Sequence, residues 1–233
     1  MELVKTGIAG FDAATGGGIP TGTRTLLYGP PGTGKTVFAL HFLWTGLQAG
    51  EAVACNASDR PFAHLRRYFR SFGWETDAFE ADGHLLPLQS FPHPESRPRD
   101  ERIRYWSGGP LENWQSVCST LEERQVTRFI GGEQSQAAFA VTSAEALLAT
   151  DQWLVDWVLH SNVTMLEIVT ATQMDVEGHR GWALSLKSLH NVIQFRIEGV
   201  RREVRILKME GAQHPLEWVP IEIGPHGIEM GVV

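Results

Sequence analysis

The chain has 233 residues, of which 42% are hydrophobic, and its formal net charge is −7. This size and composition fit one large domain, and we expect a single domain over residues 1–233. The acidic balance argues against a surface that coats nucleic acid, which requires clustered lysines and arginines. The two cysteines, Cys55 and Cys118, exclude a disulfide framework, and no apolar run is long enough to span a membrane, so we expect a cytoplasmic protein.

Strands and helices are predicted to alternate along most of the chain. Short apolar runs predict strands over residues 24–28, 51–55, 84–91, 126–130 and 163–172. Apolar residues at helical spacing predict helices over residues 36–50, 61–73, 110–121 and 144–160. Residues 92–110, which are rich in proline, glycine and charged side chains, are predicted to form a long loop.

The pattern changes in the C-terminal part of the chain. The segments VIQFRIEG, REVRILKMEG and LEWVPIEIG alternate apolar and polar residues and are separated by tight turns, which predicts an antiparallel meander. Alternating strands and helices followed by such a tail predict an α/β fold. Its sheet is expected to be mostly parallel and covered by helices, with the antiparallel strands added at one side.

The segment GPPGTGKT, residues 29–36, has the spacing of a phosphate-binding loop and lies between a predicted strand and a predicted helix. Backbone N–H groups of such a loop turn toward phosphate oxygens, and the amino end of the helix adds partial positive charge. Lys35 is expected to reach the β- and γ-phosphates of ATP, and the Thr36 hydroxyl to bind Mg²⁺. The predicted nucleotide-binding residues are Gly29, Pro30, Pro31, Gly32, Thr33, Gly34, Lys35 and Thr36.

Further segments carry a family pattern, namely TGIAGFDAATGGGIPTG at 6–22, RSFGW at 70–74, LKMEGAQH at 207–214 and IEIGPHGIEM at 221–230. With the phosphate loop, they resemble the KaiC-like branch of the RecA-type P-loop ATPases. The family's clock protein has two tandem domains, so this chain resembles a single-domain relative. The resemblance implies a RecA-like fold, ATP held at subunit boundaries and a homo-oligomer, often a hexameric ring. It is weakest between about residues 84 and 160.

The resemblance implies that hydrolysis requires a pair of adjacent glutamates shortly after the strand predicted at 51–55. The matching positions here are Ser58 and Asp59, or Asp59 and Arg60. Asp59 retains one carboxylate on a shorter stem, which can leave a general base out of reach of its water. The place of Asp59 ahead of Pro61 also fits a helix N-cap, and we favour this interpretation.

An aspartate that orders Mg²⁺ is implied at the end of the strand predicted at 126–130. Gly131 and Gly132 follow that strand, and neither supplies a ligand. The next carboxylate is Glu133, which either turns back toward the metal or is a solvated loop residue. A displaced strand boundary would change this alignment.

In the resembling family a Lys-x-Arg pair and a nearby histidine reach into the neighbouring subunit's site. Lys208 and His214 match this pattern and are predicted to contact nucleotide across a subunit boundary, but Glu210 stands at the arginine position. An arginine there is worth about 10³ to 10⁵ in rate in other nucleotide hydrolases, whereas a glutamate would repel a phosphate. Alternatively, all three are surface residues of an edge strand.

These observations lead to three hypotheses. The first is an ATP-binding module with slow or absent hydrolysis that acts as a nucleotide-stabilised regulatory or assembly protein. The second is an active ATPase that uses Asp59 and Glu133. The third is a recombinase-like binder of single-stranded DNA, based on Arg97, Arg99, Arg102 and Arg104 beside Tyr105 and Trp106. Interleaved Glu95, Asp100 and Glu101 favour a self-paired loop over this third hypothesis.

Overall fold

The structure is a computed structural model that describes residues 2–57, 61–90, 101–106, 110–134, 144–170 and 188–231. The strands are β1 (Leu3–Val4), β2 (Ile19–Pro20), β3 (Arg24–Gly29), β4 (Val53–Ala57), β5 (Leu85–Ser90), β6 (Arg104–Trp106), β7 (Arg128–Gln134), β8 (Thr164–Thr170), β9 (Asn191–Glu198), β10 (Arg201–Met209), β11 (Val219–Gly224) and β12 (Gly227–Met230). The helices are α1 (Ala9–Ala14), α2 (Lys35–Gln48), α3 (Phe62–Ser71), α4 (Asp77–Ala81), α5 (Pro110–Glu123) and α7 (Ala144–Ser161). Within these described ranges, no helix has the length and apolar character needed to cross a membrane.

Ten of the described strands form one sheet in the order β12–β11–β10–β9–β3–β8–β7–β4–β5–β6, while β1 pairs with β2 separately. Neighbours from β9 to β6 run parallel. The strands from β9 to β12 pair antiparallel with one another. The predicted α/β fold, a mostly parallel sheet with a C-terminal antiparallel meander, is confirmed.

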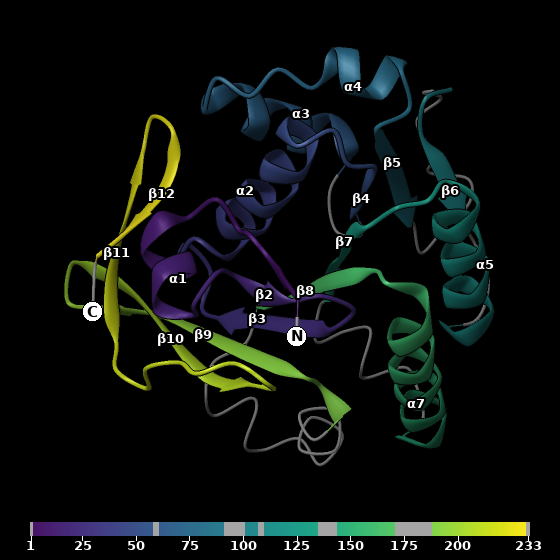
Figure 1. Ribbon diagram of the computed structural model, residues 1–233. Helices are drawn as coiled ribbons and strands as arrows, with labels where there is room; N and C mark the ends of the chain where they lie inside the picture. The colour runs from purple at the N-terminus through teal and green to yellow at the C-terminus, as the bar shows by residue number, and fades with distance from the viewer. Residues whose placement is uncertain are drawn as a thin grey trace.

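Helices cover both faces of the sheet (Figure 1). On one face α2 and α3 bury a large core that includes Phe38, Phe42 and Phe69. On the other face α5 and α7 lie side by side and bury a second core that includes Leu121 and Leu154. Strands covered on both faces bury the side chains of both faces, and this burial is why they read as continuous apolar runs in the sequence.

Two of the sequence predictions are wrong in extent. The strand predicted to stop at Ile130 continues as β7 through Gly131 and Gly132, and its register against β8 shifts between Ile130 and Glu133. Two adjacent glycines favour a turn, but the pairing of β7 with β8 continues beyond them. The loop predicted over residues 92–110 contains β6, which pairs parallel with β5. As the outermost strand of the described sheet, β6 needs no long apolar run.

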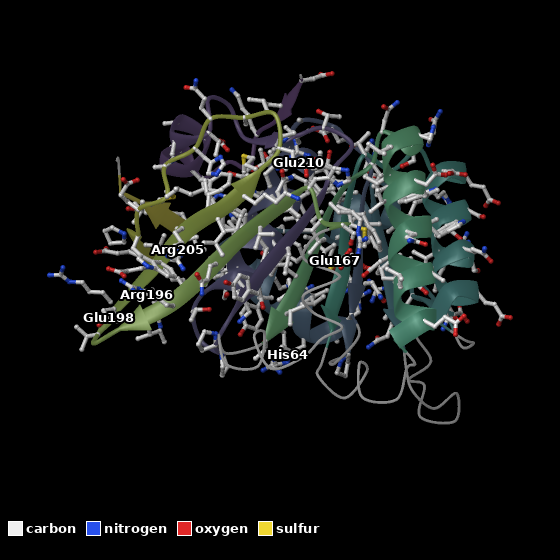
Figure 2. All side chains as sticks on the ribbon, turned by 90° about the horizontal axis from the view of Figure 1, so that it is seen from below. His64, Glu167, Arg196, Glu198, Arg205 and Glu210 are labelled. Atoms are coloured by element: carbon white, nitrogen blue, oxygen red, sulfur yellow. The ribbon has the colours of Figure 1, made fainter. Side chains whose placement is uncertain are left out.

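Arg24, the first residue of β3, lies in a buried ionic cluster with Glu167 of β8 and Asp151 of α7. Its Nε donates to Oε1 of Glu167 at 2.8 Å, and its Nη2 donates to Oδ1 of Asp151 at 3.1 Å. Burial acts to lower the pKa of Arg24, but the two carboxylates raise it overall, while burial raises the pKa of Glu167. Figure 2 shows Glu167 in the interior, on the side of α7. The cluster therefore fixes α7 to the centre of the sheet.

Arg128, the first residue of β7, bonds to three segments, namely the chain before α1, the middle of α2 and the chain that follows α2. Its Nη1 donates to the carbonyl oxygens of Lys5 and Phe42, at 2.6 and 2.9 Å. Its Nε and Nη2 donate to the two carboxylate oxygens of Glu51, at 2.7 and 2.6 Å. The guanidinium carbon also lies 4.8 Å from the centroid of the Phe42 ring. Arg128 thus holds in place the helix whose amino end carries the phosphate loop.

We expect the carboxylate of Glu51 to make the protein less stable in acid. Burial acts to raise the pKa of Glu51, but hydrogen bonds from Arg128 and Thr127 and the charge of Arg128 lower it overall. A lowered folded-state pKa stabilises the protein above the unfolded value of about 4.3, and this stabilisation is lost as the pH falls through the folded value. Urea unfolding measures the free energy of unfolding at about pH 7 and about pH 3. The decrease of this free energy between the two pH values should be smaller for Glu51→Gln than for the wild type. Equal losses would contradict this role.

Candidate nucleotide-binding site

The phosphate loop, residues 29–36, joins β3 to α2 and rests on the C-terminal meander. Gly29 has a φ of 151°, and a β-carbon on it would lie 2.2 Å from the carbonyl oxygen of Phe195 in β9. A β-carbon on Gly34, whose φ is 103°, would lie 3.3 Å from Cδ1 of Ile223 in β11. Glycine at these two positions lets the loop lie directly against the meander.

Lys35 is buried at the first position of α2, and its ammonium group lies within the loop. Its Nζ donates hydrogen bonds of 2.8 Å to each of the carbonyl oxygens of Gly29 and Pro30. The hydroxyl of Thr33 also donates to Pro30, at 2.9 Å. A cation at the amino end of a helix, beside a glycine-rich turn, is suited to bind an anion such as a phosphate group.

A pocket of about 360 Å³ opens beside the loop. One wall is formed by His64, Leu65 and Tyr68 of α3 and by Phe72, which follows the helix, and the end of β8 adds Thr170. The other lining residues are Pro31, Gly32, Gly34, Lys35, Thr36, Val37, Arg202 and Ile223. The described lining therefore contains a lysine and an arginine but neither aspartate nor glutamate. Its volume is in the range of small-molecule sites.

Sequence reasoning missed Arg202 and Thr170. Arg202 reaches the loop from β10, where its Nε donates to the carbonyl oxygen of Gly32 at 2.9 Å. It shares a strand face with the buried Val204 and Ile206 because side chains alternate along a strand. Thr170 is the last residue of β8 and lies opposite Gly29 in the parallel register. The sequence offered one signal for each residue. For Arg202 it was the alternation of side chains along a strand, and for Thr170 it was the tendency of ligand sites to lie at the carboxyl ends of parallel strands.

Asp59, predicted as a catalytic carboxylate or a helix N-cap, lies outside the described residues. The N-cap interpretation is wrong, because the N-cap residue of α3 is Pro61. Instead, the backbone N–H of Phe62 donates to Oε1 of the buried Gln89 at 3.1 Å. A side chain from β5 thus serves the helix end that a local aspartate was expected to cap.

Gly131, one of the two glycines that stand where a magnesium-binding aspartate is implied, faces away from the pocket. A β-carbon on Gly131 would lie 2.6 Å from Cε of Met165 and 3.1 Å from Cη2 of Trp114, on the α5 side of the sheet. Glu133 pairs with Ile168, and the structure does not describe its side chain. The Thr36 hydroxyl is one ligand suited to Mg²⁺, but the described lining supplies no carboxylate. Among the described residues, the pocket therefore supplies Thr36 alone of the two magnesium ligands that were expected.

Lys208, predicted to contact nucleotide in a neighbouring subunit, interacts with groups of its own chain. Its Nζ donates to the carbonyl oxygen of Leu189 at 2.6 Å and lies 2.7 Å from Oε1 of Glu210. His214 Nδ1 lies 3.1 Å from the carbonyl oxygen of Ala212. The glutamate at the expected arginine position is thus the ion partner of Lys208. Lys208 is in β10, which lies between β9 and β11, and Glu210 and His214 follow the end of that strand, so the three residues are not part of an edge strand.

The arginines considered for single-stranded DNA are only partly placed. Arg97 and Arg99 lie outside the described residues. Arg102 lies 3.9 Å from Oε2 of Glu80, and Arg104 begins β6. Glu80 belongs to α4, outside the segment that was expected to pair with itself.

Comparison with known proteins identifies the family to which this site belongs. The family model described as the KaiC ATPase matches residues 4–232. The chain belongs to the KaiC ATPase family. The resemblance seen in the phosphate loop and in the C-terminal segments is therefore confirmed.

Relatives of this KaiC-family chain differ in length. It is 27% identical over 235 residues to a UPF0273 protein of Aeropyrum pernix, covering 98% of this chain and 93% of that protein. It is 39% identical over 98 residues to the circadian clock protein KaiC3 of Synechocystis, covering 42% of this chain but 19% of KaiC3. A solved KaiC-like protein from Pyrococcus horikoshii matches with a TM-score of 0.79 and 25% identity over 99% of both chains.

Proposed function

We propose that this KaiC-family chain binds ATP beside its phosphate loop as a regulatory or assembly ligand, with slow or absent hydrolysis. The observation that carries this proposal is the difference between the residues on the two faces of the sheet. Lys35 and Thr36 line the pocket, whereas a side chain at Gly131 would enter the layer beneath α5. Lys35 and Thr36, which are suited to hold phosphate, border the pocket, while Gly131, one of the two glycines where a magnesium carboxylate was implied, faces the opposite side of the sheet.

A ligand of this kind acts by binding one state of the protein more tightly than another. The phosphate loop packs against β9 and β11, so ATP bound to the loop would stabilise the contact between α2 and the meander. We propose that the stabilised form assembles into a homo-oligomeric ring in the cytoplasm. Lys208 and His214 are the proposed contacts to a neighbouring subunit's nucleotide.

A second candidate function is ATP hydrolysis that uses Glu133, with Asp59 as a further carboxylate. The register of β7 favours it, because Glu133 pairs with Ile168, two residues before the pocket residue Thr170. This candidate differs from the first only in whether the bound nucleotide is cut.

Calorimetric titration with ATP tests the proposed function. Lys35→Ala should weaken ATP binding by about 10- to 100-fold, because it removes a cation that makes charge-assisted hydrogen bonds to phosphate. Lys5→Ala, which removes an exposed lysine side chain outside the pocket, is the control and should leave the affinity unchanged. Failure of the wild type to bind ATP, or equal binding by Lys35→Ala, would overturn the proposal.

Single-turnover hydrolysis and light scattering separate the two candidates. Under the first, the wild type should release phosphate no faster than Lys35→Ala, and its mass should rise when ATP is added. Turnover that requires Lys35 and is lost in Glu133→Gln would favour the second. An unchanged mass with and without ATP would contradict the assembly role but leave nucleotide binding intact.

A further inference from the structure

We propose that Gln89, a buried residue of β5, positions α3 and thereby sets the wall of the pocket that faces the nucleoside of bound ATP. Gln89 is not among the described residues that line the pocket, so it acts through α3. The inference rests on the proposed function, since it concerns how the same pocket holds its ligand. It makes Gln89 a positioning residue for the nucleoside and not for the phosphates.

The first observation is that Gln89 is a polar residue in the interior, with an exposed fraction of 0%. Leu86 and Leu88 of the same strand belong to the core beneath α5 and α7, whereas Leu85 belongs to the core beneath α2 and α3. Because side chains alternate along a strand, Gln89 shares the face of Leu85, on the α3 side of the sheet. A buried amide is costly unless its polar atoms are hydrogen-bonded, so the bonds of Gln89 explain why an amide is found there.

The second observation is the hydrogen bond from α3 to Gln89. The backbone N–H of Phe62, the first residue of α3, donates to Oε1 of Gln89 at 3.1 Å. The first N–H groups of a helix have no partner within the helix, and the side chain of the N-cap residue often accepts from one of them. The N-cap residue here is Pro61, whose side chain has no acceptor. The acceptor comes instead from β5, and it holds the amino end of α3 to the sheet (Figure 1).

The third observation is that the pocket face of α3 begins close to this bond. His64, Leu65 and Tyr68 line the pocket, and His64 is only two residues after Phe62. The ring centroids of His64 and Tyr68 lie 5.5 Å apart. When the phosphates lie at Lys35 and the loop, the flat rings of the nucleoside are left to this apolar and aromatic wall. A shift of the amino end of α3 therefore moves the wall relative to the phosphate loop.

A second buried contact holds α3 further along its length. Nε and Nη2 of Arg66 donate to Oε1 and Oε2 of Glu80 in α4, at 2.8 and 2.7 Å. This pair holds the middle of the helix, whereas Gln89 holds its amino end. Loss of the bond to Gln89 is therefore expected to displace the amino end, where His64 lies, while the middle of the helix stays in place.

Calorimetric titrations with ATP and with inorganic tripolyphosphate, at the same concentration of Mg²⁺, test this inference. Gln89→Met keeps the length of the side chain but removes the acceptor oxygen, so the N–H of Phe62 loses its partner. This variant should bind ATP about tenfold more weakly than the wild type. Its affinity for tripolyphosphate should stay within about twofold of the wild-type value, because the phosphate loop is unchanged. Gln89→Glu keeps an acceptor oxygen and should bind ATP within about threefold of the wild type.

Two further variants serve as controls. Gln115→Met makes the same substitution at an exposed position of α5, on the other face of the sheet, and should change neither affinity. Tyr68→Ala shortens the wall itself and should weaken ATP binding while leaving tripolyphosphate binding unchanged. It tests the wall even if Gln89→Met does not fold. Thermal unfolding without ligand shows which variants are folded.

The outcomes separate this inference from the proposed function. Equal losses of ATP and tripolyphosphate binding in Gln89→Met overturn the inference alone, because Gln89 would then support the whole site and not the wall. Wild-type affinity for ATP in Gln89→Met or in Tyr68→Ala also overturns it alone. Absence of ATP binding by the wild type overturns the inference together with the proposed function.

Discussion

Replacing Arg24 with methionine is expected to destabilise the protein by about 3 to 5 kcal/mol, because it leaves a buried carboxylate without its partner. Glu167 is only 5% exposed and receives a hydrogen bond from Arg24, whose side chain also donates to Asp151 of α7. Burial already raises the pKa of Glu167. Without the guanidinium, either the carboxylate remains charged in an apolar layer or it takes up a proton on folding. Urea unfolding at neutral pH measures the loss.

Two further variants make this result specific. Arg70→Met makes the same substitution at an exposed arginine that forms a 2.7 Å ion pair with Asp77, and it should leave the stability nearly unchanged. The double variant Arg24→Met with Glu167→Met should recover much of the loss, because the uncompensated charge is gone. If the double variant is as unstable as the sum of its two single variants, the loss comes from packing and not from the charge pair.

Replacing Gly29 with alanine is expected to destabilise the protein by about 2 to 5 kcal/mol and to weaken ATP binding with it. The added β-carbon would lie 2.2 Å from the carbonyl oxygen of Phe195, which belongs to the backbone of β9 and cannot move without disturbing the sheet. Relief would require the loop to lift from β9, and this would displace the carbonyl groups that bond Lys35. Thermal unfolding and ATP titration measure the two effects.

Gly32→Ala is the matched control for this close approach. Gly32 has a φ of 80° in the same loop, but no atom would lie within 4 Å of its added β-carbon. Its substitution should therefore destabilise the protein only by the strain of a left-handed backbone, about 1 to 2 kcal/mol. Equal losses for Gly29→Ala and Gly32→Ala would show that backbone strain, and not contact with β9, explains the requirement for glycine.

Much of the fold and the phosphate loop could be predicted from the sequence because their signals are local. A strand buried on both faces appears as a continuous apolar run, as at residues 163–172, and β8 is found there. The loop is recognisable because its glycines, Lys35 and Thr36 must occupy fixed positions within eight consecutive residues. The alternating pattern at the C-terminus predicted the meander for the same reason.

The rest of the site depends on contacts between distant residues, which no local pattern contains. The strand was predicted to end before Gly131 and Gly132, but pairing with β8 extends β7 through both, and Gly131 faces Trp114. The hydrogen bond from Arg202 to Gly32 joins residues 170 positions apart, and it exists because β10 and the loop meet on one face of the sheet. The sequence by itself thus determined that a phosphate can be held. Only the packing of the sheet decided which side chains face that phosphate, because side-chain direction follows from strand register and not from residue order.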